Sequence, residues 1–256
     1  MPTEWQKKLH GVKSRVKYIW AGRRAGKGRA VIQEALSLID ETSKKKFVVN
    51  GVDMTNTLVP PIHIWTVAPT RAQMRQVWNE MKAFIPEHLI KKRVAGQAGG
   101  RGSGWKEDEM YVELEMRDKL GNWLPGTHRR TVLWELKSAD NPESLQTVGL
   151  DFLHIAEGQD IKEAAWHKVR PTLNSPGRMG RACIEGIPPI SRSHWFSRRF
   201  RAAENKPDNN AVSIRATTFD NHYLSKEQLE DIQKEKELTT EAIWERHYMA
   251  KQPEGA

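Results

Sequence analysis

The sequence has a single cysteine, Cys183, in 256 residues, which excludes an internal disulfide framework and a cysteine-rich zinc site. Apolar runs are short: even Phe47-Val48-Val49 falls far below the roughly 20 residues that a membrane-spanning helix needs. The N-terminal residues MPTEWQKKLH lack the apolar segment of a secretory signal. We therefore expect an intracellular protein that has no membrane partner.

Negative charge is scarce in the N-terminal part of the chain. The whole sequence has 41 Lys and Arg against 32 Asp and Glu, a net charge of +9. Residues 1–50 carry a net +8, whereas residues 219–256 carry a net −4. A basic face is typical of a protein that binds a polyanion, either a nucleic acid or nucleotide phosphates. A solvated, solubilising surface is an equally weighted interpretation of the charge alone.

Hydrophobic residues make up 38% of the chain, enough for a sizeable core. Short β-like runs alternate with segments of helical periodicity, without repeats or an obvious linker. This alternation predicts an α/β fold with a mainly parallel sheet flanked by helices. The strands are expected at residues 16–20, 62–67, 110–116, 131–136, 151–156, 182–187 and 212–217, and the helices at 29–40, 71–84, 161–170, 192–201 and from 225 onward.

The strongest chemical signal is the turn after the first predicted strand. Its sequence, Ala21-Gly22-Arg23-Arg24-Ala25-Gly26-Lys27-Gly28, leads directly into an amphipathic helix. In such a turn the backbone N–H groups can face an anion and a lysine can neutralise the β- and γ-phosphates of a nucleotide. The match to G-x-x-x-x-G-K-[ST] is imperfect, because Ala21 stands at the first glycine and Gly28 stands at the hydroxyl residue. The alternative is a basic surface turn.

A second signal lies at the end of the apolar run 152–156. Glu157 follows this run directly, at the carboxyl end of a predicted buried strand, where ligands meet open α/β sheets. A phosphate-loop ATPase needs a carboxylate there to polarise the attacking water. Ala156 precedes Glu157, where a metal-binding Asp is usual. An ordinary carboxylate capping the strand exit is the alternative interpretation.

With both elements placed, the chain resembles the ATPase domain of phage large terminase subunits, the motors that package DNA into procapsids. Residues 21–27 look like the family's arginine-bearing Walker A motif, and residues 150–157 look like its Walker B motif. Further similar segments are residues 67–73 with Val77-Trp78, 138–145, 170–173, 186–188 with 194–196, and 217–225.

The resemblance implies a role for each matched residue. Lys27 would bind the β- and γ-phosphates of ATP, Arg23 would act in cis on the γ-phosphate, and Glu157 would activate water. The nucleotide would also be bound by Gly22, Arg24, Ala25, Gly26 and Gly28 of the loop, and Gln6 lies where an adenine-contacting glutamine often precedes it. Residues 186–188 would form the coupling motif that links hydrolysis to movement of a lid.

The chain departs from the family pattern at its usual Mg²⁺ ligands. Gly28 replaces the Ser or Thr of Walker A, and Ala156 replaces the Asp of Walker B. Either Mg²⁺ is held by the phosphates, by water and by Glu157, or turnover is slow. Ile187 stands where a Thr or Ser is usual, and Gln146 stands where many members have an arginine; Arg129 or Arg130 could supply that arginine instead.

The resemblance also implies an organisation and a set of partners. We expect a P-loop NTPase core at residues 1–215 and a small helical lid at residues 216–256. The lid would lead to a nuclease domain or subunit that is absent from this chain. Expected partners are double-stranded DNA, the portal protein and the small terminase subunit, in the cytoplasm of the host cell. The expected assembly is a homo-oligomeric ring on the portal, with a monomer as the alternative in isolation.

The sequence thus predicts ATP hydrolysis that drives translocation of double-stranded viral DNA, with ATP and Mg²⁺ as cofactors. Candidate DNA contacts are the Gly-rich basic loop at residues 91–106 and the arginines Arg192, Arg198, Arg199 and Arg201. Two alternatives stay open. One is another P-loop enzyme, such as a kinase or a helicase. The other is a nucleotide- or DNA-binding module with weakened catalysis.

Overall fold

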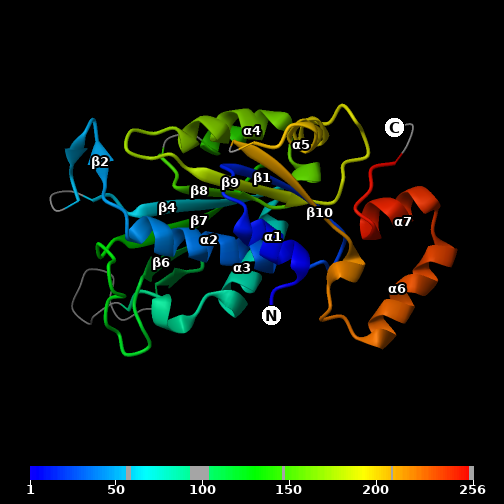
Figure 1. Ribbon diagram of the computed structural model, residues 1–256, viewed down its shortest axis with the longest axis horizontal. Helices are drawn as coiled ribbons and strands as arrows, with labels where there is room; N and C mark the ends of the chain where they lie inside the picture. Colours follow the sequence, from blue (N-terminus) through cyan, green and yellow to red (C-terminus); the bar gives the residue numbers. More distant parts are fainter. Residues whose placement is uncertain (56–58, 93–103, 146–147, 209, 254–256) are drawn as a thin grey trace. The chain divides into compact units, whose positions relative to one another are not determined.

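The computed structural model describes residues 1–55, 59–92, 104–145, 148–208 and 210–253. The chain divides into two compact units. The first unit comprises residues 1–31, 155–163 and 182–256, and the second comprises residues 32–154 and 164–181. Each unit is described by itself below (Figure 1).

Three parallel strands form the sheet of the first unit, in the order β10, β1, β9. Their bounds are Ala211–Ala216, Val16–Ala21 and Arg181–Gly186. All six residues of the central strand β1 are buried, as expected for a parallel strand covered on both faces. The register places Ile19 between Ile214 of β10 and Glu185 of β9.

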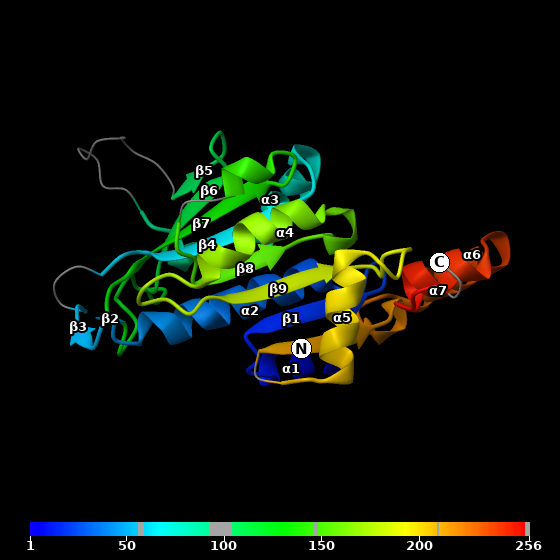
Figure 2. The ribbon, with the colours of Figure 1, turned by 90° about the horizontal axis from the view of Figure 1, so that it is seen from above.

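Helices α1 (Glu4–Gly11) and α5 (Trp195–Asn205) lie on opposite faces of these strands (Figures 1 and 2). Alternate residues of β1 face each of them. Trp20 stacks on Phe200 of α5 with ring centroids 3.8 Å apart. On the other face, the ammonium group of Lys17 donates to the Leu9 carbonyl of α1 over 2.7 Å. The period of two along β1 therefore fixes both layers.

Beyond β10 the chain forms a short helical segment, which we call the lid. It begins with the 3₁₀ turn η5 (Thr218–Asp220) and continues with α6 (Lys226–Leu238) and α7 (Glu241–Tyr248). Ser225 and Thr240 cap the two helices, accepting from the backbone N–H groups of Gln228 and Ile243. The first of these caps lies at residue 225, where the sequence predicts a helical segment to begin.

The main strands of the second unit, among the described residues, follow the order β8, β4, β7, β6, β5. Their bounds are Phe152–Ile155, Ile62–Ala68, Thr131–Ser138, Tyr111–Glu115 and Trp105–Lys106. Strands β4 and β7 are parallel, whereas β6 and β5 add an antiparallel edge. A separate small hairpin pairs β2 (Val48–Val49) with β3 (Val52–Asp53).

Two long helices accompany these strands, α2 (Lys27–Ser43), which leads into the second unit, and α3 (Arg71–Phe84), which packs on β4 and β7. Helix α4 (Glu163–Val169) lies on the opposite face of β4 and β7 from α3 (Figure 1). The remaining short 3₁₀ turns are η1 (Glu87–Leu89), η2 (Pro142–Leu145), η3 (Gly158–Asp160) and η4 (Arg170–Leu173).

Mostly parallel strands flanked by helices confirm the predicted α/β class. The helix predicted at residues 71–84 is confirmed with its Thr70 cap, whose hydroxyl accepts from the Gln73 N–H. The helix predicted at 192–201 instead begins at Trp195, because Ser191 and His194 close a turn and the His194 side chain caps the helix. Helix α1 was not predicted. The division at residue 215 stays a prediction.

Among the described residues, no helix is both long and apolar enough to cross a membrane.

A buried ion pair in the second unit yields a first testable prediction. Asp151 accepts from the Arg178 guanidinium and from the backbone N–H of His63, and both charged side chains are 10% exposed. We expect Asp151→Ala to lower the free energy of unfolding by about 3–5 kcal/mol, because the Arg178 charge would stay buried without its partner. Urea denaturation measures this loss.

Arg181→Gln is the matched control, since it breaks the ion pair between Arg181 and Glu41 at the surface. Exposed pairs contribute about 0–1 kcal/mol. Equal losses in the two variants would contradict a special contribution from the buried pair.

Candidate nucleotide-binding site

The turn between β1 and α2 has the backbone of an anion-binding loop. Strand β1 ends at Ala21 and α2 begins at Lys27. Within the turn, Arg24 and Gly26 adopt positive φ angles of 59° and 85°. Left-handed residues within such a turn can make neighbouring N–H groups point to one side, and the first N–H groups of a helix have no intrahelical acceptor. The segment from Arg24 to Gly28 is therefore suited to hold phosphate oxygens.

The first part of the loop, Gly22 and Arg23, is bound by the lid and by the end of β10. The Arg23 N–H donates to the His247 carbonyl over 2.7 Å, and the Gly22 N–H donates to the Ala216 carbonyl over 2.9 Å. In return, the Thr218 hydroxyl donates to the Arg23 carbonyl over 2.7 Å, and the Asn221 side chain donates to the Arg24 carbonyl over 2.6 Å. The N–H groups of Gly22 and Arg23, predicted as phosphate donors, are thus already used.

Gly22 is where the lid approaches most closely. A Cβ atom at this position would lie 2.6 Å from both the Thr218 hydroxyl oxygen and the Tyr248 carbonyl oxygen. Real Cβ atoms essentially never come that close to backbone, so only glycine fits here. The sequence pattern expects a glycine one position earlier, at Ala21, and the structure explains the shift by this contact.

The acidic strand end has an unusual backbone. After β8 the buried Ala156 leads to Glu157, which adopts a left-handed conformation with φ 51° and ψ 53° and caps η3. A non-glycine residue in this region is uncommon and is over-represented at functional sites. The Gln159 amide donates to the Glu157 carboxylate over 2.8 Å and to the Asp160 carboxylate over 3.0 Å. Glu157 is thereby oriented rather than loose.

Lys27 and Glu157 lie within electrostatic reach of one another. Burial raises the pKa of the Glu157 carboxyl, the neighbouring Glu185 carboxylate raises it further, and the Lys27 ammonium opposes both. Both segments belong to the first unit. The phosphate loop and the acid therefore lie in one unit and interact electrostatically, and their joint action on a nucleotide stays a prediction. Glu185, 3% exposed on β9, is a second carboxylate near Glu157 that sequence reasoning missed.

Gln6 also reaches the loop. It is 8% exposed, its amide oxygen accepts from the Thr3 N–H over 3.0 Å, and its amide nitrogen donates to the Gly26 carbonyl over 3.4 Å. The side chain supports the loop from α1. Its contact with adenine stays a prediction.

The predicted coupling segment, residues 186–188, connects the acid to the lid. A Cβ atom at Gly186 would lie 2.0 Å from the Gln159 amide oxygen, so the segment passes directly against the residue that orients Glu157. Two residues later, the Pro188 carbonyl accepts from the Arg246 Nε of α7 over 2.6 Å. The buried Ile187 lies between these contacts.

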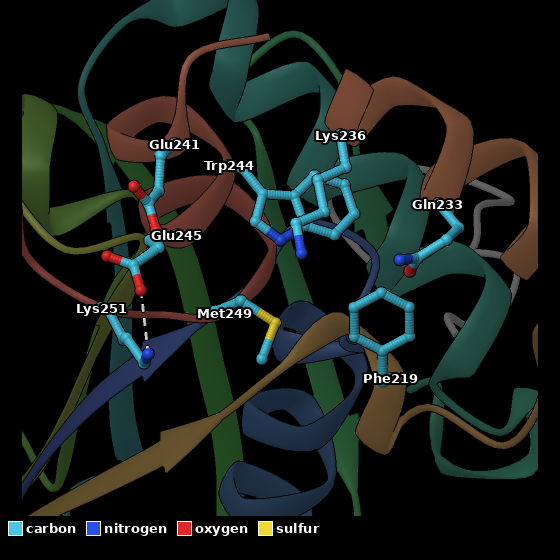
Figure 3. A pocket seen from close by; sticks show the side chains of 8 residues that line it. All are labelled: Phe219, Gln233, Lys236, Glu241, Trp244, Glu245, Met249 and Lys251. Atoms are coloured by element: carbon cyan, nitrogen blue, oxygen red, sulfur yellow. Dashed lines mark hydrogen bonds and ion pairs between the residues drawn. The ribbon is translucent and has the colours of Figure 1, made fainter. Parts of the chain in front are cut away.

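An aromatic cluster holds α7 in place (Figure 3). Trp244 is 4% exposed, and its ring lies 6.1 Å from Phe219 and 4.6 Å from Tyr248. Beside it lies an open groove of about 350 Å³ between α6, α7 and η5, where Lys251 donates to Glu245 over 2.9 Å. The cluster fixes the rotation of α7 and so directs Arg246 and His247 toward the loop.

The predicted DNA contacts differ in how far they are available. Arg198 pairs with Glu163 at 2.7 Å and Arg201 bonds to Gln252, whereas Arg192 and Arg199 are exposed. In the loop at residues 91–106, Lys91 pairs with Glu113 at 3.5 Å, and residues 93–103 lie outside the described part of the chain.

The two arginines that could replace the family's arginine at position 146 differ in exposure. Arg130 is buried and donates to the carbonyls of Pro60 and Thr42, which is a structural role. Arg129 is exposed. Gln146, where the family often has an arginine, lies outside the described residues.

Comparison with known proteins identifies the fold. The ATPase domain of the large terminase of Thermus phage P74-26 is 20% identical, with a TM-score of 0.68 over 99% of this chain and 94% of that one. A second large terminase, from another thermophilic bacteriophage and solved in complex with ADP, is 12% identical, with a TM-score of 0.63 over 97% of this chain and 53% of that one. The chain thus has the fold of a large terminase ATPase domain, a P-loop NTPase fold, as predicted.

The family model described as phage terminase large subunit matches residues 131–250. The large terminase of bacteriophage HK97 is 11% identical, with a TM-score of 0.63 over 98% of this chain and 51% of that one. The chain spans about half the length of the HK97 protein and of the terminase solved with ADP. No curated protein matches it. The resemblance stated from the sequence is thus confirmed in the segment that the family model matches and in the fold.

Several residues of this candidate site were missed as individual site residues. Glu185, Thr218, Asn221, Arg246 and His247 all contact or electrically influence the loop or the acid. Thr218 and Asn221 lie in the segment 217–225, whose resemblance to the family was a usable signal. Arg246 and His247 carried no sequence signal, because only the packing of α7 brings them to the loop.

The electrostatics of Glu157 yield the second prediction. Because its pKa is raised on folding, the folded protein binds this proton more tightly, and stability falls as pH rises from the unfolded pKa through the folded one. Glu157→Gln removes the buried charge. We therefore expect the variant without nucleotide to have a higher Tm than the parent at pH 7–8, and the difference to shrink toward pH 4.

Differential scanning fluorimetry across this pH range measures the effect. Glu163→Gln is the control, since it removes a carboxylate that pairs with Arg198 at the surface. A Tm of Glu157→Gln that stays below the parent's at every pH would show that Glu157 stabilises the fold.

Proposed function

We propose that this chain hydrolyses ATP and couples the hydrolysis to translocation of double-stranded viral DNA into a procapsid. The observation that carries the proposal is the meeting of Lys27, at the end of a left-handed loop, with Glu157, at the end of a buried strand, inside one compact unit. The loop supplies a cation and backbone donors for the phosphates, and the strand end supplies an acid for the water.

The chemistry asked of these residues is positioning and charge stabilisation. Lys27 and the N–H groups of Arg24 and of residues 26–28 neutralise and orient the phosphates, since the Ala25 N–H already donates to the Gly22 carbonyl. Arg23 is exposed beside the loop and can reach outward to the γ-phosphate. Glu157 holds the attacking water and accepts its proton, and its raised pKa makes it a better base than an exposed carboxylate.

The residues present fit Mg²⁺ held mainly by the nucleotide. The described residues contain no group of three or more His, Cys, Asp or Glu side chains that could hold a metal ion. Mg²⁺ commonly uses one or two carboxylates together with substrate phosphates and water, and Glu157 and its neighbour Glu185 are the candidate carboxylates. The bound ion would neutralise charge on the phosphates.

The proposed setting follows from the family. We propose that the chain acts on double-stranded DNA as part of a ring on the portal protein, with the small terminase subunit as a partner and a nuclease domain or subunit as a neighbour. The large terminase solved with ADP has also been solved with ATP-γ-S, which supports nucleotide binding here. Host cytoplasm is the proposed location.

One alternative has a specific observation in its favour. Gly28 and Ala156 remove the two side chains that usually hold Mg²⁺, as in a module that binds nucleotide or DNA with weakened catalysis. Phosphate release at raised protein concentration, with DNA present, separates the two functions. Zero turnover with intact ATP binding would favour the binding module.

The third prediction concerns catalysis. We expect Lys27→Ala and Glu157→Gln each to lower ATPase turnover by at least ~10³-fold, because one loses phosphate neutralisation and the other the base. Glu157→Gln should still bind ATP with the parent's affinity. The measurements are steady-state phosphate release and titration with a fluorescent ATP analogue.

Glu163→Gln serves again as the control and should turn over like the parent. Full turnover in Glu157→Gln would remove Glu157 from the role of base.

The fourth prediction concerns DNA. Binding through phosphates is sequence-independent, and the logarithm of the binding constant falls with the logarithm of salt concentration by about 0.9 per neutralised phosphate. We expect the double variant Arg192→Gln, Arg199→Gln to reduce this slope by about 2. Fluorescence anisotropy of a labelled duplex between about 50 and 200 mM salt measures the slope.

Lys234→Gln, which removes an exposed charge from the acidic helix α6, is the matched control and should leave the slope unchanged. An unaltered slope in the double variant would exclude Arg192 and Arg199 as DNA contacts.

A further inference from the structure

Arg246 of the lid occupies a position between the coupling segment and the phosphate loop. Its Nε donates to the Pro188 carbonyl over 2.6 Å, and its Nη1 lies 3.2 Å from Nε2 of His247. His247, in turn, holds the Arg23 N–H through its backbone carbonyl at 2.7 Å. One residue pair of α7 therefore touches both the segment that follows β9 and the loop that follows β1.

Positive charge accumulates at this point. Burial lowers the pKa of Arg246, Asp160 raises it, and the like charge of Arg23 lowers it. Burial also lowers the pKa of His247, and Arg23 and Arg246 lower it further. The imidazole is therefore neutral near pH 7 and its Nε2 can accept from Arg246. Two arginines thus lie within electrostatic reach of one another, with Asp160 as the acid that acts on Arg246.

Arg246 has donors to spare for an anion. A guanidinium group carries five N–H donors in a planar fork, and the hydrogen bonds among the described residues use two of them. Two neighbouring arginines repel each other in the absence of an anion, and a phosphate between them would turn this repulsion into attraction. Arg23 belongs to the loop itself, so the anion that both could share is the end of the triphosphate.

We propose that Arg246 is a phosphate-sensing residue of the lid, which binds the terminal phosphate of ATP while its Nε keeps the Pro188 carbonyl. The inference rests on the proposed ATP site and adds a contact from α7. ADP lacks the terminal phosphate and so leaves the fork of Arg246 without this ligand. The nucleotide state is thereby transmitted to two places at once, to residues 186–188 through Pro188 and to α7 through its own backbone.

The test compares affinities for ATP-γ-S and ADP in the presence of Mg²⁺. A hydrogen bond to a charged group contributes enough that its loss weakens binding about 10-fold to 100-fold. We expect Arg246→Gln to weaken ATP-γ-S by this factor and to change ADP by less than about twofold. Isothermal titration calorimetry gives both constants.

Arg246→Lys separates charge from geometry. A lysine keeps the positive charge, but it has no planar fork that can hold a carbonyl and a phosphate together. It should lie between the parent and Arg246→Gln for ATP-γ-S. If Arg246→Gln does not fold, Arg246→Lys alone decides the question, with selective weakening of ATP-γ-S expected.

Arg215→Gln is the matched control. Arg215 also donates to a backbone carbonyl of the C-terminal segment, that of Ala250 at 3.1 Å, but its other partner is Glu204, on α5. It should leave the ratio of the two affinities unchanged.

A second experiment measures whether the nucleotide state changes the coupling segment and α7. Hydrogen exchange of residues 186–188 and 241–248 should differ between the ATP-γ-S and ADP complexes of the parent, and this difference should vanish in Arg246→Gln. Equal weakening of both nucleotides, or an unchanged ratio, would overturn the sensing role while leaving the ATP site intact. Failure of the parent to bind either nucleotide would overturn the proposed function itself.

Discussion

The site depends on an ionisable carboxyl group kept in poor contact with water. Glu157 follows a fully buried strand, and Glu185 brings a second carboxylate into its neighbourhood. Burial and like charge both work against ionisation, and Lys27 is the cation that the structure sets against them. The left-handed backbone at residue 157 and the Gln159 amide hold the carboxylate in this place. A fold that maximised stability alone would not keep this arrangement, which is a reason to interpret it as functional.

The lid is part of the loop's structure as well as its neighbour. Carbonyls of Arg23 and Arg24 accept from Thr218 and Asn221, and the Arg23 N–H donates to His247. Any movement of the lid must therefore break or carry these bonds. Because the close contact at Gly22 leaves no room for a side chain, the loop and the lid behave as one packed surface. These hydrogen bonds couple the conformation of the loop to the position of α7, so they would couple the proposed phosphate binding to the lid.

The sequence predicted those features that depend on local pattern. The run 16–21 reads as a buried strand because each residue type suits a covered sheet, and the Thr70, Ser225 and Thr240 caps are visible because capping is a matter of neighbouring residues. Lys27 and Glu157 could be proposed from the sequence because their predicted roles need a fixed position relative to a strand end. Arg246 and Glu185 were not, since only tertiary packing between segments far apart in the chain brings them to the site. Helix α1 was missed because a short helix with three buried residues has little periodicity to detect.

The difference between local sequence pattern and tertiary packing also affects the interpretation of the missing Mg²⁺ ligands. In the sequence, Gly28 and Ala156 replace the hydroxyl residue of Walker A and the Asp of Walker B, which suggests an enzyme with weakened catalysis. Read in space, the first unit sets Lys27, Arg23 and Arg246 near Glu157, Glu185 and Asp160, so charge of both signs still surrounds the place for the phosphates. An ATP molecule brings negative charge of its own, which the cations offset directly, and it brings oxygen ligands that a metal ion can use in place of protein side chains. The chemistry then depends on which charged side chains the fold brings together. The spacing of motifs along the sequence predicts only some of them.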